Sequence, residues 1–419
     1  MFEYRLFCIN CRKILLIEFE LLLYIKLFSY VFPTLKFFEL IFDLSNVIII
    51  LLLFVVHHKS AVVKSWLLFI LFFCGYCILE FFFLNNDIFL FCWGMRNIFR
   101  FFIMFYAAIT FLTIDDILLL FKKMYLCLIL NIIIITIQFL VGVDRDCIGG
   151  SFGLEKNCNA ITNVFLVATF SYYFVMTLSN KESKYKLLVV TIGSLYWALL
   201  AELKIFFVEF FIIVCLCMLF IGKGKTKFIL ANSFLFLFII SYFVMSHIYP
   251  EQAEFIVNPS SILWYLQHVN GGAYGFGRTT ALSMSYVVFF NSDIIKTIFG
   301  LGVGGAEFIN VFGLEYYSDF YLKYVEYAYF GYFLSMTFIQ TGFIGLIWFV
   351  LFFVKILNII MKIRSINPEL SLFSFVFFIC ILICAFKDSS LNISICGYIS
   401  FIFLAIPCIC YYRRLKRYS

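Results

Sequence analysis

The chain has 419 residues, of which 64% are hydrophobic and only 13% are charged, and its formal net charge at neutral pH is +7. A water-soluble protein of this size cannot bury so much apolar surface, so the composition excludes a soluble globular enzyme. The chain also has no basic stripe or nucleic-acid recognition motif, so we expect no nucleic-acid partner.

Apolar runs long enough to cross a lipid bilayer recur along the whole chain. They predict an all-α, polytopic integral membrane protein with about twelve transmembrane helices. The fourth run is the weakest, because Arg96 and Arg100 lie near its start, and a helix that begins near Ile88 is an alternative. The predicted spans are Lys13–Val31, Leu35–Val56, Trp66–Leu84, Ile98–Leu112, Met124–Val141, Ala160–Leu178, Leu187–Leu203, Ile205–Ile221, Phe228–Tyr249, Gly331–Ile356, Leu372–Phe386 and Leu391–Tyr411.

The basic residues between these spans predict the orientation of the protein. When the spans alternate in direction, the most basic loops and both ends of the chain fall on one side, which the positive-inside rule assigns to the cytoplasm. These groups are Arg5/Arg12/Lys13, Lys59/Lys64, Lys122/Lys123, Lys181/Lys184/Lys186, Lys223/Lys225/Lys227, Lys362/Arg364 and Arg413/Arg414/Lys416/Arg417.

A long polar-leaning segment divides the chain into three parts. Residues 1–249 form an N-terminal bundle of about nine spans, and residues 330–419 form about three spans with a basic cytoplasmic tail. Residues 250–329 form a large loop on the extracytoplasmic side, which in a bacterium with two membranes is the periplasm. Long loops between membrane spans are commonly functional, so we expect the chemistry to lie there.

Several basic residues lie on the side that the positive-inside rule normally depletes. Arg96, Arg100, Arg145 and Lys204 belong to this set, and Lys204 follows Glu202 in a tight turn between two spans. Arg matches the oxygens of a phosphate group with its planar fork, so phosphate binding is one explanation. The alternatives are snorkelling of these side chains to the membrane interface and simple pairing of Glu202 with Lys204.

The large loop carries the strongest single candidate, Arg278, which follows the glycine-rich run that ends at Gly277. The apolar spacing in Thr279–Phe299 predicts a surface helix with Arg278 near its N-terminus, where backbone N–H groups favour an anion. A second glycine run contains Gly300, Gly302 and Gly304, and His268 is a candidate base. The two Cys-x-x-Cys pairs, Cys8/Cys11 and Cys74/Cys77, lack further ligands at zinc spacing, so no metal site is predicted.

Four short motifs resemble, in order and spacing, those of the bacterial O-antigen polymerase and ligase superfamily. The resemblance covers about residues 149–346. At one position it departs from the ligases, because Gly331-Tyr332 stands where they carry His-Asn at the start of a span, and this favours the polymerase branch. The motifs are Gly150-Ser-Phe-Gly153 with Asn157 and Asn159, Glu202-Leu-Lys204, Gly277-Arg278 with Gly300-Leu-Gly302-Val-Gly304, and Gln340-Thr-Gly342-Phe-Ile-Gly345.

The resemblance implies a metal-independent glycosyltransferase without a cofactor, located in the bacterial inner membrane with its active face in the periplasm. It would join oligosaccharide repeat units carried on undecaprenyl diphosphate. The side chains that would bind the diphosphate are Arg278, Lys204, Arg145, Arg96 and Arg100. The acceptor hydroxyl would be deprotonated by Glu202, His268 or another acidic residue. Membrane lipid, a chain-length regulator and the flippase of the same pathway are the implied partners.

Two other functions compete with this expectation. The first is the ligase that transfers finished polysaccharide to lipid A core, which the missing His disfavours. The second is the flippase that moves lipid-linked oligosaccharide across the membrane. Flippases have short loops throughout, so the long segment 250–329 argues against that function.

Overall fold

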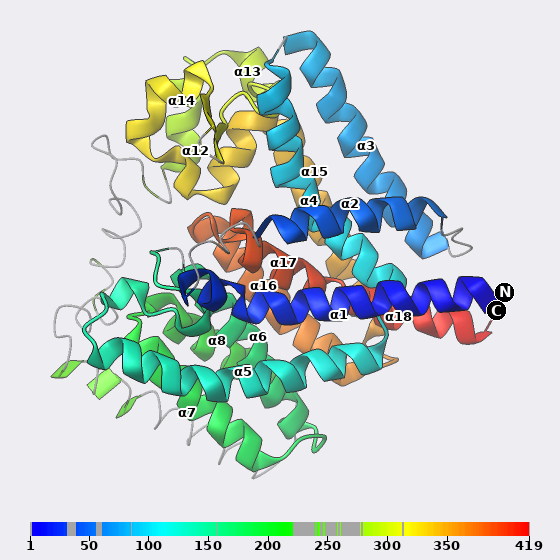
Figure 1. The fold of residues 1–419 in the computed structure, drawn as a ribbon, viewed down its shortest axis with the longest axis vertical. Coiled ribbons are helices and arrows are strands. Elements are labelled where there is room, and N and C mark those ends of the chain that lie inside the picture. Colours follow the sequence, from blue (N-terminus) through cyan, green and yellow to red (C-terminus); the bar gives the residue numbers. More distant parts are fainter. Residues whose placement is uncertain are drawn as a thin grey trace.

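The computed structural model describes residues 2–31, 39–55, 61–84, 86–156, 158–220, 280–311 and 314–418, together with residues 239–240, 242–243, 246–247, 258, 260 and 277. Helices form nearly all of this structure, and one pair of short strands is added on a peripheral lobe (Figure 1). The Phe2 end of the first helix and the last helix lie at the same end of the molecule (Figure 1).

Each of the first eight predicted spans coincides with a helix. The helix bounds extend beyond the apolar runs at several ends, because polar residues at the helix ends continue the backbone hydrogen bonds. Most of the ninth predicted span, Phe228–Tyr249, lies outside the described residues. The eight helices are α1 (Phe2–Val31), α2 (Glu39–Val55), α3 (Ala61–Leu84), α4 (Ile88–Phe111), α5 (Ile114–Leu140), α6 (Cys158–Leu178), α7 (Lys184–Leu200) and α8 (Lys204–Phe220).

The C-terminal part holds a small lobe followed by the last predicted spans. The lobe contains α12 (Ala281–Met284), α13 (Ile294–Phe299), α14 (Asp319–Tyr324) and the antiparallel strands β1 (Phe308–Val311) and β2 (Leu314–Tyr317). The single surface helix expected over Thr279–Phe299 is therefore wrong in detail, because α12 continues into a π-helix at Ser285–Phe289 and a turn at Asn291 and Ser292, where φ is positive, then separates it from α13. The last helices are α15 (Phe333–Ile363), α16 (Pro368–Lys387), α17 (Ser394–Leu404) and α18 (Ile406–Tyr418).

In the described part of the chain, seven helical segments are long and apolar enough to cross a membrane. This agrees with an all-α membrane protein, and the larger number of about twelve spans stays a prediction. The segments are Val63–Leu84, Ile88–Phe111, Ile114–Leu140, Cys158–Leu178, Phe333–Ile363, Pro368–Lys387 and Ser394–Tyr412.

The fourth helix begins early, at Ile88, as the alternative bounds had predicted. Its first turn is capped by Asp87, whose carboxylate accepts hydrogen bonds from the N–H groups of Phe89 and Leu90. Such caps satisfy backbone donors that have no partner within the helix. Arg96 and Arg100 consequently lie inside α4, on its third and fourth turns, and not in a loop before it.

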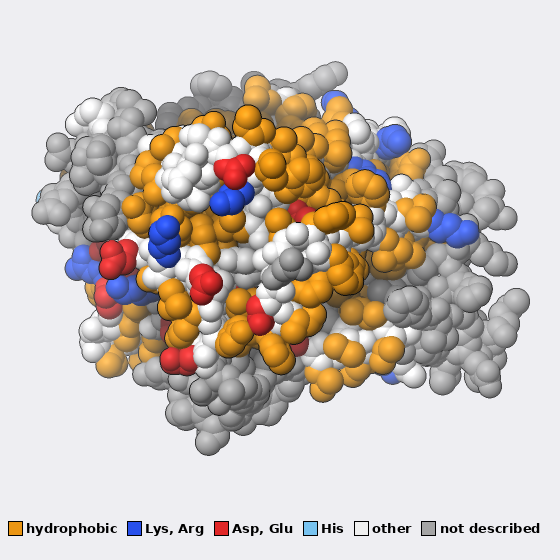
Figure 2. All heavy atoms as spheres, turned by 90° about the horizontal axis from the view of Figure 1, so that it is seen from above, with side chains coloured by type: hydrophobic (Ala, Val, Ile, Leu, Met, Phe, Trp, Pro, Cys, Tyr) orange, Lys and Arg blue, Asp and Glu red, His pale blue; other side chains and the backbone are white. Residues whose placement is uncertain are grey.

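The molecule is organised around α6. In its most apolar 18-residue window, 94% of the residues are buried, and the helix packs on α5, α7, α8, α16 and α17. A helix that is apolar on all sides and enclosed by other helices forms the centre of a bundle. The outer helices by contrast expose apolar side chains, as Phe82, Phe83 and Phe89 do on α3 and α4. Hydrophobic side chains also cover much of the face seen in Figure 2.

The lobe is joined to the bundle mainly through α13, which packs on α15. At this contact α15 is interrupted at Gly342, whose φ of 58° and ψ of −158° are not helical. The N–H of Leu301 donates to the carbonyl of Ile339 at 2.8 Å, and the Tyr76 hydroxyl donates to the carbonyl of Thr341 at 3.3 Å. The backbone groups near the break thus find partners on other elements, as irregular backbone among membrane helices requires.

Candidate functional site

A cavity of about 400 Å³ lies where α1, α4, α15 and α17 meet the lobe. Aromatic side chains, among them Phe101, Phe330 and Phe333, form much of its wall. This volume falls in the range of small-molecule binding sites, which combine an apolar wall with a few polar groups. The polar groups that line it are Lys26, Asn97, Arg100, Glu155, Glu307, Gln340, Ser389, Asn392 and Ser394.

Arg100 is the buried cation of this cavity, with 7% of its surface exposed. Its Nη1 donates to the hydroxyl of Ser394 at 2.9 Å, and its Nη2 donates to the carbonyl of Asn392 at 2.8 Å. Both acceptors are neutral, and no described carboxylate forms an ion pair with this guanidinium. A buried charge that is hydrogen-bonded but forms no direct ion pair with a described carboxylate is energetically costly, which makes it a candidate for a functional role.

Glu307 is a buried carboxyl group of the same cavity, also 7% exposed. The carboxylate accepts from Nε2 of Gln340 at 2.8 Å and from Nδ2 of Asn97 at 3.2 Å. Burial raises the pKa of Glu307 above its ordinary value of 4.5, and the two amide donors and the nearby Arg100 and Arg96 oppose that rise. The group therefore holds a proton more readily than a carboxyl in water.

Asn97 links Glu307 to a second arginine. Its Oδ1 accepts from Nη1 of Arg96 at 2.8 Å, while its Nδ2 donates to Glu307. Arg96 in turn forms an ion pair of 2.5 Å with Asp43 of α2, and its guanidinium carbon lies 4.2 Å from the ring centre of Trp93. Arg96 is thus held by a carboxylate and an aromatic ring, whereas Arg100 lines the cavity and, among the described residues, forms no ion pair with a carboxylate.

Lys26 and Glu155 form a further pair at the cavity. Nζ of Lys26 lies 3.4 Å from Oε2 of Glu155, and the Glu155 side chain is 66% exposed. Because this pair faces water, it adds little to stability and its partners can separate at small cost. Lys26 was not among the candidates from the sequence, although a lysine in the middle of an apolar run is a signal that could have identified it.

Arg145, Glu202 and Lys204 come together at a different place, the turn between α7 and α8. Nη1 of Arg145 donates to Oε1 of Glu202 at 2.8 Å. Glu202 has a φ of 49°, and Lys204 begins α8, its N–H donating to the carbonyl of Glu202 at 2.8 Å. The expected proximity of Glu202 and Lys204 is present, and Arg145 joins them through a contact that chain spacing did not indicate.

Two of the candidate catalytic residues, Arg278 and His268, lie outside the described residues. Gly277, which precedes Arg278, is described: its N–H donates to the Thr280 hydroxyl at 2.9 Å, and its carbonyl accepts from Ala281 at 2.8 Å. Gly277 thus stands at the entry to α12.

The glycines of the second run serve close packing of the lobe on the bundle. The φ angles of Gly300, Gly302 and Gly304 are 78°, 82° and 89°, in the left-handed region that favours glycine. A Cβ added to Gly304 would collide with the backbone of Leu90. A Cβ added to Gly94 of α4 would lie 2.7 Å from the nitrogen of Gly304. These glycines hold the segment just before β1, which carries Glu307, against the helix that carries Arg100.

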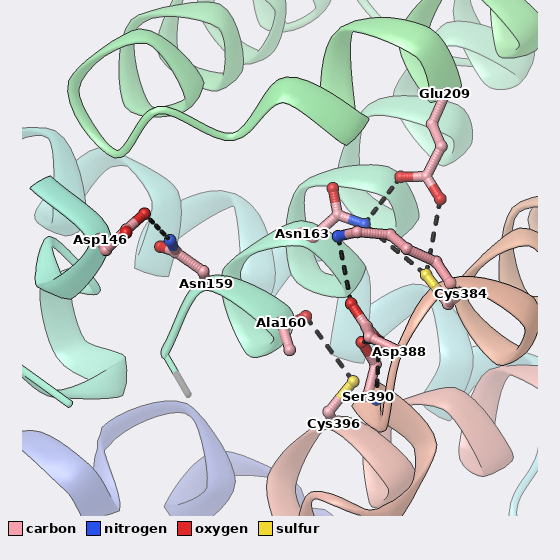
Figure 3. A network of polar contacts seen from close by, with 10 residues as sticks. Asp146, Asn159, Ala160, Asn163, Glu209, Cys384, Asp388, Ser390 and Cys396 are labelled. Atoms are coloured by element: carbon pink, nitrogen blue, oxygen red, sulfur yellow. Dashed lines mark hydrogen bonds and ion pairs between the residues drawn. The ribbon is translucent and has the colours of Figure 1, made fainter. Parts of the chain in front are cut away.

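A second buried polar network was missed by the sequence analysis (Figure 3). Glu209 of α8 is fully buried, and its carboxylate accepts from Nδ2 of Asn163 at 2.7 Å and from the Cys384 thiol at 3.5 Å. Asn163 lies on α6 and Cys384 on α16, so three helices meet at this carboxylate (Figure 3). A single Glu inside the apolar run Ile205–Ile221 was the available signal.

Within the described ranges, no group of three or more His, Cys, Asp or Glu side chains is arranged to hold a metal ion. Comparison of the chain with protein-family models and with curated proteins found no match. The case for a function therefore rests on the residues of the cavity and on the sequence motifs.

Proposed function

We propose that this protein is a polysaccharide polymerase that joins oligosaccharide repeat units carried on undecaprenyl diphosphate, at the periplasmic face of a bacterial inner membrane. The observation that carries the proposal is the cavity beside Arg100. It combines a buried guanidinium lacking a described carboxylate partner with amide and hydroxyl groups and an aromatic wall. Arg fits phosphate oxygens, and aromatic rings and amides fit sugars.

Arg100 would bind the diphosphate of the donor and stabilise the negative charge that grows on the departing phosphate. Donors positioned beforehand for such charge are effective because they need no rearrangement during the reaction. Lys26 at the same cavity would add a second positive charge once it separates from the exposed Glu155. Arg145, Lys204 and Arg278 remain proposed diphosphate ligands outside this cavity.

The ion pairs are consistent with the alternation of spans from which the orientation was predicted. Arg12 with Asp116, and Lys181 with Glu369, join segments that the charge pattern places on the cytoplasmic side. The pair of Arg96 with Asp43 joins the predicted external loop before the fourth span to the external half of the second predicted span, and the pair of Arg145 with Glu202 joins two predicted external segments. Each pair connects segments of the same predicted side, as correct alternation of the spans demands.

The cavity follows this pattern. Asn97 and Arg100 lie near the middle of α4, where the fourth predicted span begins, and Asn392 lies between α16 and α17, just after the predicted external loop Lys387–Ser390. The lobe that contributes Glu307 belongs to the large predicted loop. A lipid carrier embedded in the outer leaflet would therefore place its diphosphate at the level of Arg100.

The proposal is tested with purified protein in liposomes that contain undecaprenyl-diphosphate-linked repeat units. Wild-type protein should produce a ladder of longer oligosaccharides, and an Arg100→Lys variant should not. Lys355→Met is a matched control, because Lys355 binds Ser65 far along α15 from the cavity, and it should produce the wild-type ladder. Transfer only to added lipid A core would instead favour the ligase, and movement of the lipid-linked units without joining would favour the flippase.

A further inference from the structure

Glu307 has three properties that together indicate a role beyond support of the fold. The carboxylate lies in the cavity wall, it is buried, and it is fixed by two amide side chains from different helices, Gln340 of α15 and Asn97 of α4. Both amides donate to it, so each carboxylate oxygen is oriented before any ligand enters. Such preorganisation by neighbouring hydrogen bonds is typical of groups that act on a substrate.

The charged and titratable groups around Glu307 balance each other. Arg96 and Arg100 face it from α4, and Tyr329 faces it from the lobe, with its hydroxyl donating to the carbonyl of Ala306 at 2.8 Å. Lys26 and Glu155 line the same cavity. The arginines favour the ionised carboxylate and burial favours the neutral acid, so both protonation states are accessible, as a proton acceptor needs.

We propose that Glu307 is the general base that deprotonates the acceptor sugar hydroxyl. This inference rests on the proposed function and on the placement of Glu307 and Arg100 in the wall of one cavity. The site so defined takes two lipid-linked sugars, a donor with its diphosphate at Arg100 and an acceptor with its hydroxyl at Glu307.

The step balances without a metal or a redox partner. The acceptor hydroxyl gives its proton to the Glu307 carboxylate while its oxygen forms a bond to the anomeric carbon of the donor. The bond from that carbon to the phosphate oxygen breaks, and its electron pair leaves on the phosphate as undecaprenyl diphosphate. The protonated Glu307 then releases its proton to water, and Arg100 stabilises the charge on the leaving group.

Glu307→Gln and Glu307→Asp test the assignment, and Glu326→Gln is the matched control because it removes an exposed carboxylate of the same lobe that does not line the cavity. Each variant is assayed in liposomes for chain extension as a function of pH. Binding of undecaprenyl diphosphate alone is measured in parallel. We expect Glu307→Gln to lose about 100-fold or more of the extension rate, as removal of a general base does, while binding changes little.

The pH profile separates catalysis from support of the fold. The rate of chain extension by wild-type protein should rise with pH because only the ionised carboxylate accepts the proton. This rising limb of the pH profile should lie above the ordinary carboxyl pKa of 4.5. The limb should move to lower pH in Glu307→Asp and stay in place in Glu326→Gln. This shift decides the matter even when Glu307→Gln fails to fold.

The outcomes distinguish the two proposals. If wild-type protein binds undecaprenyl diphosphate but extends no chain, the polymerase function fails, and the base assignment fails with it. If wild-type protein extends chains and Glu307→Gln does so at a comparable rate, only the assignment of Glu307 is overturned. An unshifted limb in Glu307→Asp overturns that assignment as well.

Discussion

Gly300 and Gly342 meet backbone to backbone where the lobe joins the interrupted helix α15. A Cβ on Gly300 would lie 2.5 Å from the carbonyl oxygen of Gln340 and 2.6 Å from the nitrogen of Gly342. A Cβ on Gly342 would collide with the carbonyl of Ile298. The contact allows α13 to lie directly on the break, and it sets the position of Gln340, which holds Glu307 in the cavity wall.

Alanine at Gly300 or Gly342 should therefore destabilise the protein. The φ and ψ of Gly300 are 78° and −162°, a region that essentially only glycine adopts. Strain of about 1–3 kcal/mol from the backbone angles adds to the steric overlap, so we expect a loss of more than about 2 kcal/mol. Thermal unfolding in detergent measures this loss. Gly75→Ala is the control, because nothing lies within 4 Å of its Cβ position, and an unfolding temperature for Gly342→Ala equal to that of Gly75→Ala would contradict the packing argument.

Arg100→Lys should weaken binding of undecaprenyl diphosphate although it keeps the positive charge. Two N–H groups of the guanidinium donate to the hydroxyl of Ser394 and to the carbonyl of Asn392. The ammonium group of a lysine cannot make both contacts and also bind a ligand. Charged hydrogen bonds contribute about 1.5–3 kcal/mol, so the dissociation constant should rise roughly tenfold or more. Native mass spectrometry with undecaprenyl diphosphate, and with undecaprenyl monophosphate for comparison, measures it. Unchanged affinity would remove Arg100 from the binding site.

Asp388→Asn should lower stability at neutral pH. Burial alone would raise the pKa of Asp388, but Lys387 and the hydrogen bonds from the N–H and hydroxyl of Ser390 outweigh it and hold the pKa below the ordinary 3.8. A carboxyl whose pKa falls on folding stabilises the protein above its unfolded pKa, and this stabilisation is lost as the pH falls through the folded value.

The expected loss at pH 7 is about 1–2 kcal/mol, and it should disappear in strongly acidic solution, below the folded pKa of this carboxyl. Unfolding temperatures of wild type and variant across this pH range provide the measurement. Asp144→Asn is the control, because Asp144 is exposed and its side chain caps no helix. A difference between wild type and Asp388→Asn that stays constant with pH would contradict the argument.

The orientation can be tested with two matched substitutions. Lys296 on α13 and Lys184 at the start of α7 are both exposed, and the charge pattern places them on opposite sides of the membrane. In spheroplasts, a membrane-impermeant maleimide should label Lys296→Cys and should label Lys184→Cys only after lysis. The native thiols are controlled with unsubstituted protein. Labelling of Lys184→Cys before lysis, with protection of Lys296→Cys, would reverse the orientation.

The sequence predicted helices well and predicted their mutual placement poorly. Apolar runs depend on local composition, so spans such as Ala160–Leu178 matched α6 within two residues. The start of α4 could be recognised from Ile88, because Asp87 is a good N-cap residue. The break at Gly342 was not recognised, since a glycine in an apolar helix is common and its cause, Gly300, lies far away in the chain.

For the candidate site as well, the sequence identified individual residues but not the contacts between them. Arg96 and Arg100 were found because arginines near a membrane span are costly and therefore noticeable. Glu307 was one of several acidic residues in the loop, and only the fold brings it to Gln340 and Asn97. Contacts between residues hundreds of positions apart, such as that of Arg100 with Ser394, cannot be derived from spacing in a single sequence.

The central claim is that the protein joins lipid-linked repeat units outside the cytoplasmic membrane, and deletion of its gene tests this claim most directly. Lipopolysaccharide of the deletion strain, separated on a gel, should carry a single repeat unit, and untransferred lipid-linked units should accumulate on the periplasmic side. Wild-type protein should restore the long-chain ladder, and Arg100→Lys should not. A normal ladder in the deletion strain, or accumulation of the units on the cytoplasmic side, would contradict the account.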